Sequence, residues 1–260
     1  MIDLGPIDLS PLNIAALGLF GVCWLFYQPL LTLLGRRGGA VINTDLAVVR
    51  SAWMHNMAKR QNRFMDGQLL AQTLSSSSFF ASSNLILIAA TAGVLFGGQA
   101  SFRNVSSLAV IKTSSRLLFE LELALVVVTL ARGLLDFIWG IRQLNYVLAA
   151  IGATPEHADD DTHHAFGDAA GRLLNPALHS VNAGVRGYYF ALAAAAWLFG
   201  PIPFIAATLG AVGLLVWRQR RSPAAYAIAD LRKLIENYSP PAGAASRTAV
   251  ESEPGGASLP

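Results

Sequence analysis

Charged residues are scarce in this 260-residue chain. They make up 13% of the sequence, whereas hydrophobic residues make up 53% and the mean hydropathy is +0.46. A soluble domain carries about 25% charged residues, so this composition indicates a membrane protein. Cysteine is nearly absent as well. Cys23 is the single thiol, so the chain cannot form an intrachain disulfide, and a metal site made of cysteines alone would need several chains.

The sequence also lacks the motifs that usually mark an enzyme. It contains no GxSxG nucleophile elbow, no GxxxxGKS/T phosphate loop, no GxGxxG after a strand and no HExxH zinc motif. We therefore expect a protein that is not an enzyme and that holds no cofactor. Nothing in the distribution of charge indicates nucleic-acid binding.

Apolar runs are present and long. Residues 12–34, 79–97 and 117–140 are long enough, or nearly so, to cross about 30 Å of hydrocarbon. Residues 188–217 form a fourth apolar region, which Pro201 and Pro203 interrupt. It is either one broken helix or a hairpin that turns at Gly200, Pro201 and Pro203, with spans near 184–199 and 204–217.

The distribution of Lys and Arg favours the hairpin, because basic residues gather on the cytoplasmic side of membrane proteins. Asp3 and Asp8 precede the first run, and Arg36 and Arg37 follow it, which is the order of an uncleaved span with its N-terminus outside. Five spans then place 15 basic residues inside and 3 outside, whereas four spans place 9 on each side. The expected fold is all-α, a polytopic transmembrane helical bundle of about five spans, or four if the hairpin is a single broken helix.

Arginine outnumbers lysine by 16 to 3, which is typical of a GC-rich bacterial genome. We therefore expect a multi-pass protein of the bacterial inner membrane with a cytoplasmic C-terminus. Residues 1–238 would form the transmembrane helical domain. Residues 239–260 are rich in Pro, Gly, Ala and Ser, so a disordered tail is predicted.

Residues 44–72 have helical spacing and predict a basic amphipathic helix on the cytoplasmic side. One interpretation is that it packs on the bundle as an extension of the second span. The other is that it lies in the headgroup layer against anionic lipid. The residues predicted to face lipid or a partner are Arg50, Trp53, Lys59, Arg60 and Arg63.

Polar residues recur every seventh position through the third apolar run, where a step of seven returns to nearly the same side of a helix. The second run carries polar residues at the same interval. The seam predicted within the membrane comprises Glu120, Glu122, Thr129, Arg132, Asp136, Asn84 and Thr91. One interpretation is that this seam lines a path for protons or ions. The other is that the seam is structural. In the structural interpretation Arg132 pairs with Asp136 and Arg116 with Glu120 at i, i+4, so that Glu122 needs cover from protein.

Residues 152–172 are acidic and rich in small residues, which predicts a flexible connection. Histidines and aspartates gather there, and imidazole with carboxylate suits zinc, iron or copper. The spacing is not that of a helical zinc motif, so we expect no metal. The residues to test for one are His157, His163 and His164.

Four strings of this sequence together resemble one family. They are RSAWMHNM, FFASSNLILI, RQLNY and NAGVRGYYFALAAAAWLFGPIP, within residues 45–221. The chain is similar to the multi-pass membrane proteins grouped as domain of unknown function 599. The resemblance implies an integral membrane protein and brings no established activity, cofactor or catalytic residue.

Two classes of function fit these observations. The first is a non-catalytic accessory or assembly subunit of an inner-membrane complex, whose partners are membrane lipids and either other subunits or further copies of this chain. The alternative is a channel or transporter for ions, protons or a small solute that uses the polar seam. A metal-handling role for the His/Asp segment is a third interpretation.

Overall fold

The computed structural model describes residues 10–36, 42–107 and 115–238, and within these ranges it contains helices and no β-strand. The all-α prediction is confirmed. The predicted tail lies outside the described residues. In chain order the elements are α1 (Pro11–Arg36), α2 (Ile42–Ala58), α3 (Phe64–Phe96), α4 (Gly98–Ser106), α5 (Arg116–Ala153), α6 (Asp160–Ala195), the 3₁₀ helix η1 (Ala196–Phe199), α7 (Pro201–Arg220) and α8 (Pro223–Asn237).

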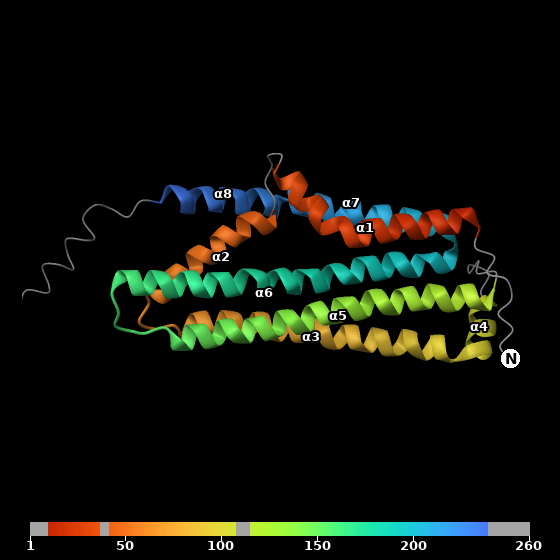
Figure 1. The fold of residues 1–260 in the computed structure, drawn as a ribbon, viewed down its shortest axis with the longest axis horizontal. Helices are drawn as coiled ribbons and strands as arrows, with labels where there is room; N and C mark the ends of the chain where they lie inside the picture. The colour runs from red at the N-terminus through yellow and green to blue at the C-terminus, as the bar shows by residue number, and fades with distance from the viewer. Residues whose placement is uncertain (1–9, 37–41, 108–114, 239–260) are drawn as a thin grey trace, which may run out of the picture.

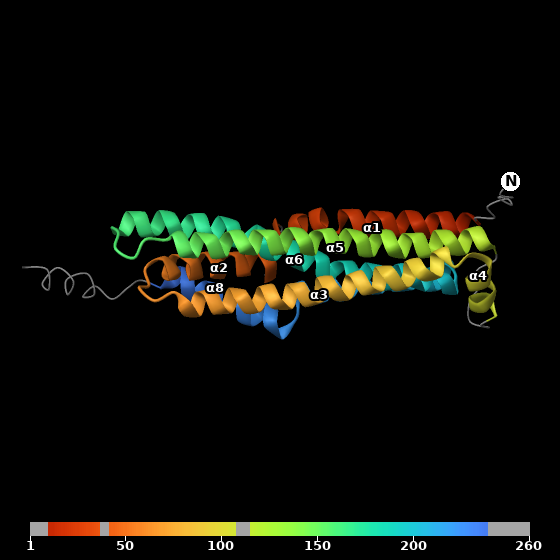
Figure 2. The ribbon, with the colours of Figure 1, turned by 90° about the horizontal axis from the view of Figure 1, so that it is seen from below.

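Three long helices run side by side through the whole length of the molecule (Figures 1 and 2). Helices α3, α5 and α6 have 33, 38 and 36 residues. At 1.5 Å per residue each is roughly 50 to 57 Å long, well over the 30 Å of a bilayer core. Helices α1 and α7 pack beside one half of this trio, and α2 and α8 beside the other half (Figure 1). We call these the α1–α7 half and the α2–α8 half.

Each half has its own apolar core. In the α1–α7 half, Phe20 of α1, Leu130 of α5, Phe190 of α6 and Phe204 of α7 belong to one buried cluster. The core of the α2–α8 half is formed by Met54, Met57, Leu70, Leu144, Val147, Ile151, Ala170, Leu174 and Ala177. The long helices therefore connect two separately packed bundles.

The turn between α6 and α7 depends on one glycine. Gly200 has φ +108°, a conformation that side chains with a Cβ rarely adopt, and Pro201 follows at the first position of α7. The indole of Trp197 donates a hydrogen bond to Oδ1 of Asn13 at 2.9 Å, which ties the turn to α1. The chain reverses here, as the hairpin interpretation predicts.

The predicted amphipathic helix 44–72 is wrong as a single element, because α2 ends at Ala58 and α3 begins at Phe64. Arg63 stabilises the turn between the two helices. Its guanidinium donates to the carbonyl oxygens of Met57, Ala58, Thr154 and Pro155. It thereby satisfies the free carbonyls at the end of α2 and joins this turn to the loop between α5 and α6.

The prediction of a flexible connection over 152–172 is also wrong for most of that segment. Helix α6 begins at Asp160, where the side chain of Asp159 accepts a hydrogen bond from the amide of Thr162 at 3.2 Å. The acidic residues stand in the first turn, where they complement the helix dipole. Helix α6 continues through Gly167. A Cβ there would lie 2.8 Å from the Cα of His55, so this glycine allows α2 to approach α6 closely.

Among the residues that the structure describes, two segments are long and apolar enough to cross a membrane, Phe64–Phe96 and Pro201–Asn237, the second covering α7 and α8. Only 6% of the most apolar window in the first is buried inside the protein, and 17% in the second. The core helix of a soluble protein would be mostly buried, so these exposures favour association with a membrane.

Candidate functional site: a cationic cavity between the two halves

The polar seam of α5 is divided between two environments. Glu122 and Thr129 are buried in the bundle. Asn84 of α3 is buried too, and its Nδ2 donates to the backbone oxygen of Leu130 at 3.0 Å, which joins α3 to α5. The hydroxyl of Thr91 donates to the carbonyl of Leu87 in its own helix at 2.8 Å. Within this part of the seam, Asn84 therefore joins two helices, whereas the Thr91 hydroxyl bonds within its own helix.

The two ion pairs of the structural interpretation are present. Nε of Arg116 lies 2.7 Å from Oε1 of Glu120, and Nε of Arg132 lies 3.4 Å from Oδ2 of Asp136. Arg132 and Asp136 also line a cavity, and Glu122 does not line it.

This cavity has a volume of about 300 Å³ and lies among α1, α5 and α6. Its polar lining comes from Thr129, Arg132 and Asp136 of α5 and from His179, Ser180 and Arg186 of α6. Trp24, Leu25 and Phe190 supply apolar walls. The side chain of Arg132 is 62% exposed, so the cavity opens to the surface beside it. Among the lining residues, Asp136 is the single carboxylate, and it faces two arginines and a histidine.

Arg186 is the most unusual member of the lining, because it is a charged residue with only 8% of its surface exposed. Its guanidinium carbon lies 5.8 Å from the ring centre of Tyr27, a cation–π contact with α1. The buried Nη1 atom has no hydrogen-bond acceptor among the residues that the structure places. A buried guanidinium nitrogen without an acceptor is costly, which makes this cavity a candidate site for an anion.

Close packing of α5 on α6 fixes the position of Arg186. A Cβ on Gly187 would lie 3.1 Å from the Cα of Gly133, and one on Gly184 would lie 2.7 Å from the ring of Phe137. The small residues on either side of Arg186 thus bring the two backbones together, and the arginine occupies the space beside them. In the sequence, Arg186 lies in the string NAGVRGYYFALAAAAWLFGPIP, which carries the family resemblance, and nothing in that string marks the arginine as part of a site.

Further cavities adjoin this one and extend its positive charge. One, of about 380 Å³, is lined by Arg50, Arg186 and Arg218 among others, and another, of about 300 Å³, by Arg50 and His179. Burial lowers the pKa of Arg50 from its ordinary value. Arg50 therefore faces the interior of the protein between α2, α6 and α7.

The other residues predicted on the basic amphipathic helix also make internal contacts. Trp53 donates its indole N–H to Oδ1 of the buried Asp66 at 2.7 Å, and Arg60 forms an ion pair with the same carboxylate. Arg63 bridges two turns, as described above. Lys59 is exposed. For Trp53, Arg60 and Arg63 the contacts agree with packing on the bundle rather than with a surface facing lipid.

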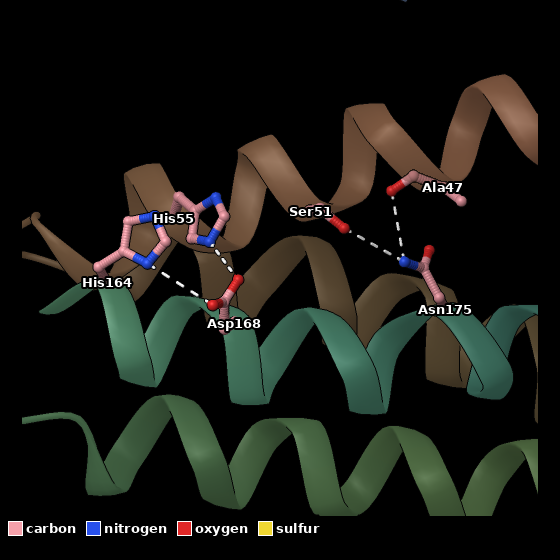
Figure 3. A network of polar contacts seen from close by, with 6 residues as sticks. All are labelled: Ala47, Ser51, His55, His164, Asp168 and Asn175. Carbon is pink, nitrogen blue, oxygen red and sulfur yellow. Dashed lines mark hydrogen bonds and ion pairs between the residues drawn. The ribbon is translucent and has the colours of Figure 1, made fainter. Parts of the chain in front are cut away.

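A second polar cluster lies where α2 crosses α6 (Figure 3). Nε2 of His55 lies 2.8 Å from Oδ1 of Asp168, and Nδ1 of His164 lies 3.6 Å from Oδ2 of the same carboxylate. The two imidazole rings stack with their centres 4.5 Å apart. The hydrogen bond from His55 and the nearby positive charges hold the pKa of Asp168 below its usual range. Further along the same crossing, Asn175 donates to Ala47 and Ser51.

Of the histidines singled out from the sequence, this cluster contains His164 and lacks His157 and His163. The donor atoms of His55, His164 and Asp168 lie within 4.8 Å of one another, and this donor set suits zinc or iron(II). In the present arrangement each carboxylate oxygen already faces an imidazole. His55 and Asp168 were missed because they lie 113 positions apart and only the fold brings them together.

The fold and this site define an all-α protein with segments suited to crossing a membrane. The chain belongs to the family described as "Protein of unknown function, DUF599", whose sequence model matches residues 15–224. This match confirms the resemblance drawn from the sequence. No curated protein and no solved structure matches the chain.

Proposed function

We propose that this protein is a non-catalytic subunit of a bacterial inner-membrane complex, which it joins through a water-exposed helical extension. The apolar residues on the surface of that extension carry the proposal. Its five spans would be α1, the parts of α3, α5 and α6 in the α1–α7 half, and α7. The N-terminus would lie outside and the α2–α8 half in the cytoplasm.

The placement of the membrane rests on length and charge. Counted from the α4 end, 30 Å of helix accounts for about 20 residues of α3 and α5, and the remainder of these long helices projects beyond the bilayer. The turn between α2 and α3, the loop between α5 and α6 and helix α8 then share one side. This is the side with 15 basic residues against 3 on the other, which matches the cytoplasm.

Exposed apolar residues on the α2–α8 half lie where lipid would not reach them. Phe64 and Met65 at the start of α3 are 68% and 64% exposed. Leu234 of α8 is 70% exposed, and Tyr226 on the same helix is also exposed. Soluble surfaces rarely carry such residues in groups unless another protein covers them. A partner subunit or a second copy of the chain would bury them.

The channel interpretation receives less support. A path for protons or ions needs the seam to continue along α5, and Glu122 does not line the cavity that contains Arg132 and Asp136. Because Asn84 bonds α3 to α5 beside the seam, these polar groups serve packing. The accessory role therefore accounts for more of the geometry.

Photo-crosslinking in native membranes tests the proposal. A photoreactive amino acid at Phe64 or Leu234 should give discrete adducts heavier than the monomer, identified by mass spectrometry as one recurring subunit or as this chain itself. The matched control is Gln72, an exposed polar position further along α3. Monomer alone at both apolar positions, in membranes from cells at native expression, would contradict the role.

A further inference from the structure

We propose that the cavity around Arg186 binds the phosphate group of an anionic phospholipid from the cytoplasmic leaflet. This inference goes beyond the accessory role and uses only the membrane placement described above. It rests on three features of the cavity. A buried guanidinium has an unsatisfied nitrogen, positive charge is in excess, and the lining changes from apolar to polar in the direction in which a lipid changes from acyl chain to headgroup.

The guanidinium supplies the chemical requirement. Arg186 is more than nine-tenths buried, Nη1 has no acceptor among the described residues, and the side chain lines the cavity. A buried arginine is stable when an anion or several carbonyl groups accept its hydrogen bonds. Phosphate oxygens match the planar fork of a guanidinium and accept two parallel hydrogen bonds.

The surrounding charges favour an anion of this kind. Arg132 lines the same cavity as Arg186, and Arg50 lines the cavities that adjoin it. Asp136 offsets one of these charges through its contact with Arg132. The remaining positive charge would repel the ammonium group of a zwitterionic lipid and attract a headgroup with net negative charge.

The order of the lining favours a lipid over a free anion. Along α6, Phe190 lies toward the membrane interior, Arg186 follows, and His179 and Ser180 lie toward the cytoplasm. The distance from Phe190 to His179 along the axis is about 16 Å. On α5, Arg132 stands roughly 24 Å from the outer end of the helix at Arg116, close to the inner boundary of a 30 Å core. Trp24 and Leu25 add apolar wall on the membrane side.

The size and access of the cavity agree with this occupant. A volume of about 300 Å³ holds a phosphate with part of its glycerol and leaves the acyl chains outside against the exposed Leu25. The opening beside Arg132 allows a lipid to enter laterally from the leaflet. A cavity closed on all sides would have required a small soluble ligand.

Thermal unfolding of the full chain in an uncharged maltoside detergent, after removal of lipid, tests the proposal. Phosphatidylglycerol should raise the melting temperature of the wild type, whereas diacylglycerol, which lacks the phosphate, should not. Inorganic phosphate at the same concentration should give a much smaller rise. An equal rise with diacylglycerol would overturn the phosphate site, and an equal rise with inorganic phosphate would overturn the lipid as its source.

Two variants assign the effect to the cavity. Arg132→Gln, at a half-exposed position where folding should be preserved, should weaken the apparent affinity for phosphatidylglycerol about tenfold, because one charge-assisted contact is lost. Arg186→Met should abolish the response. Without lipid this variant should melt no lower than the wild type, because an uncompensated buried charge has been removed. A purely structural Arg186 would instead give a lower melting temperature with and without lipid.

The matched control is Arg142→Gln, an exposed arginine further along α5 that does not line the cavity. It should respond to phosphatidylglycerol as the wild type does. Wild-type affinity in Arg132→Gln, or equal loss in Arg142→Gln, would contradict the assignment. Because no partner protein is present, this test stands apart from the crosslinking experiment, and either proposal can fail alone.

Discussion

Arg186 and Asp168 illustrate how a single side chain reports on its surroundings. Arg186 is buried with an unsatisfied nitrogen, which directs attention to the cavity it lines. Asp168 is exposed enough to remain solvated, yet it faces two imidazoles across the crossing of α2 and α6. The first residue supports the ligand that we propose, whereas the second is explained by contacts between the helices themselves.

Asp168→Asn tests the contribution of this carboxylate. The hydrogen bond from His55 lowers the pKa of Asp168 relative to the unfolded chain. The stability that it contributes is therefore fully present above the ordinary aspartate value of about 3.9 and is lost as the pH falls through the lowered pKa. We expect the wild type to melt higher than Asp168→Asn at pH 5 and the difference to shrink toward pH 3. A difference in melting temperature between the two proteins that stays constant from pH 5 to pH 3 would contradict the contact.

At the scale of the element, sequence patterns predicted helices well and their ends poorly. The structural interpretation of the polar seam paired Arg116 with Glu120 and Arg132 with Asp136 at i, i+4, and both pairs are present. The gap between α2 and α3 was missed because Arg63, which binds the carbonyls at the end of α2, is also held there by carbonyls 91 and 92 positions away. Local periodicity contains no information about such distant acceptors.

The glycines of α6 show the same limit. In the sequence, Gly167 and the acidic residues before it resemble a flexible loop. In the structure they form the start of a helix whose glycine lies against His55. The interpretation of a glycine as a breaker or as a contact point depends on which helix packs on it, and that is a property of the tertiary structure.

Gly140→Ala tests the close approach of α5 and α6. A Cβ at this position would lie 2.7 Å from Cγ2 of Val181 and 3.0 Å from its backbone nitrogen, so the helices would have to separate. We expect a loss of stability of about 1 to 3 kcal/mol, the usual cost of overpacking. Gly67→Ala is the control, because its Cβ would meet nothing within 4 Å. It should be neutral or slightly stabilising, and equal losses in both variants, measured by unfolding in detergent, would contradict the packing.

At the scale of the whole molecule, the sequence predicted the all-helical class and the reversal at Gly200, and it underestimated how far the helices extend. Runs of apolar residues marked only the parts of α3, α5 and α6 in the α1–α7 half. Their continuations pack around Met54, Met57 and Leu144 in a second core, and these stretches lack the long apolar runs that mark a span. The cavity at the junction was not predicted, since its lining combines α5 and α6 with α1, which is distant from them in the chain.

The central claim is that the two ends of this elongated bundle lie on opposite sides of a membrane. Labelling with a membrane-impermeant maleimide tests it most directly, using Asn104→Cys in α4 and His157→Cys in the loop between α5 and α6, each in a Cys23→Ser background. Both positions are exposed. The account predicts that Asn104→Cys reacts in intact cells, and that His157→Cys reacts only in inverted vesicles or after permeabilisation. Reaction of both from the same side would contradict it.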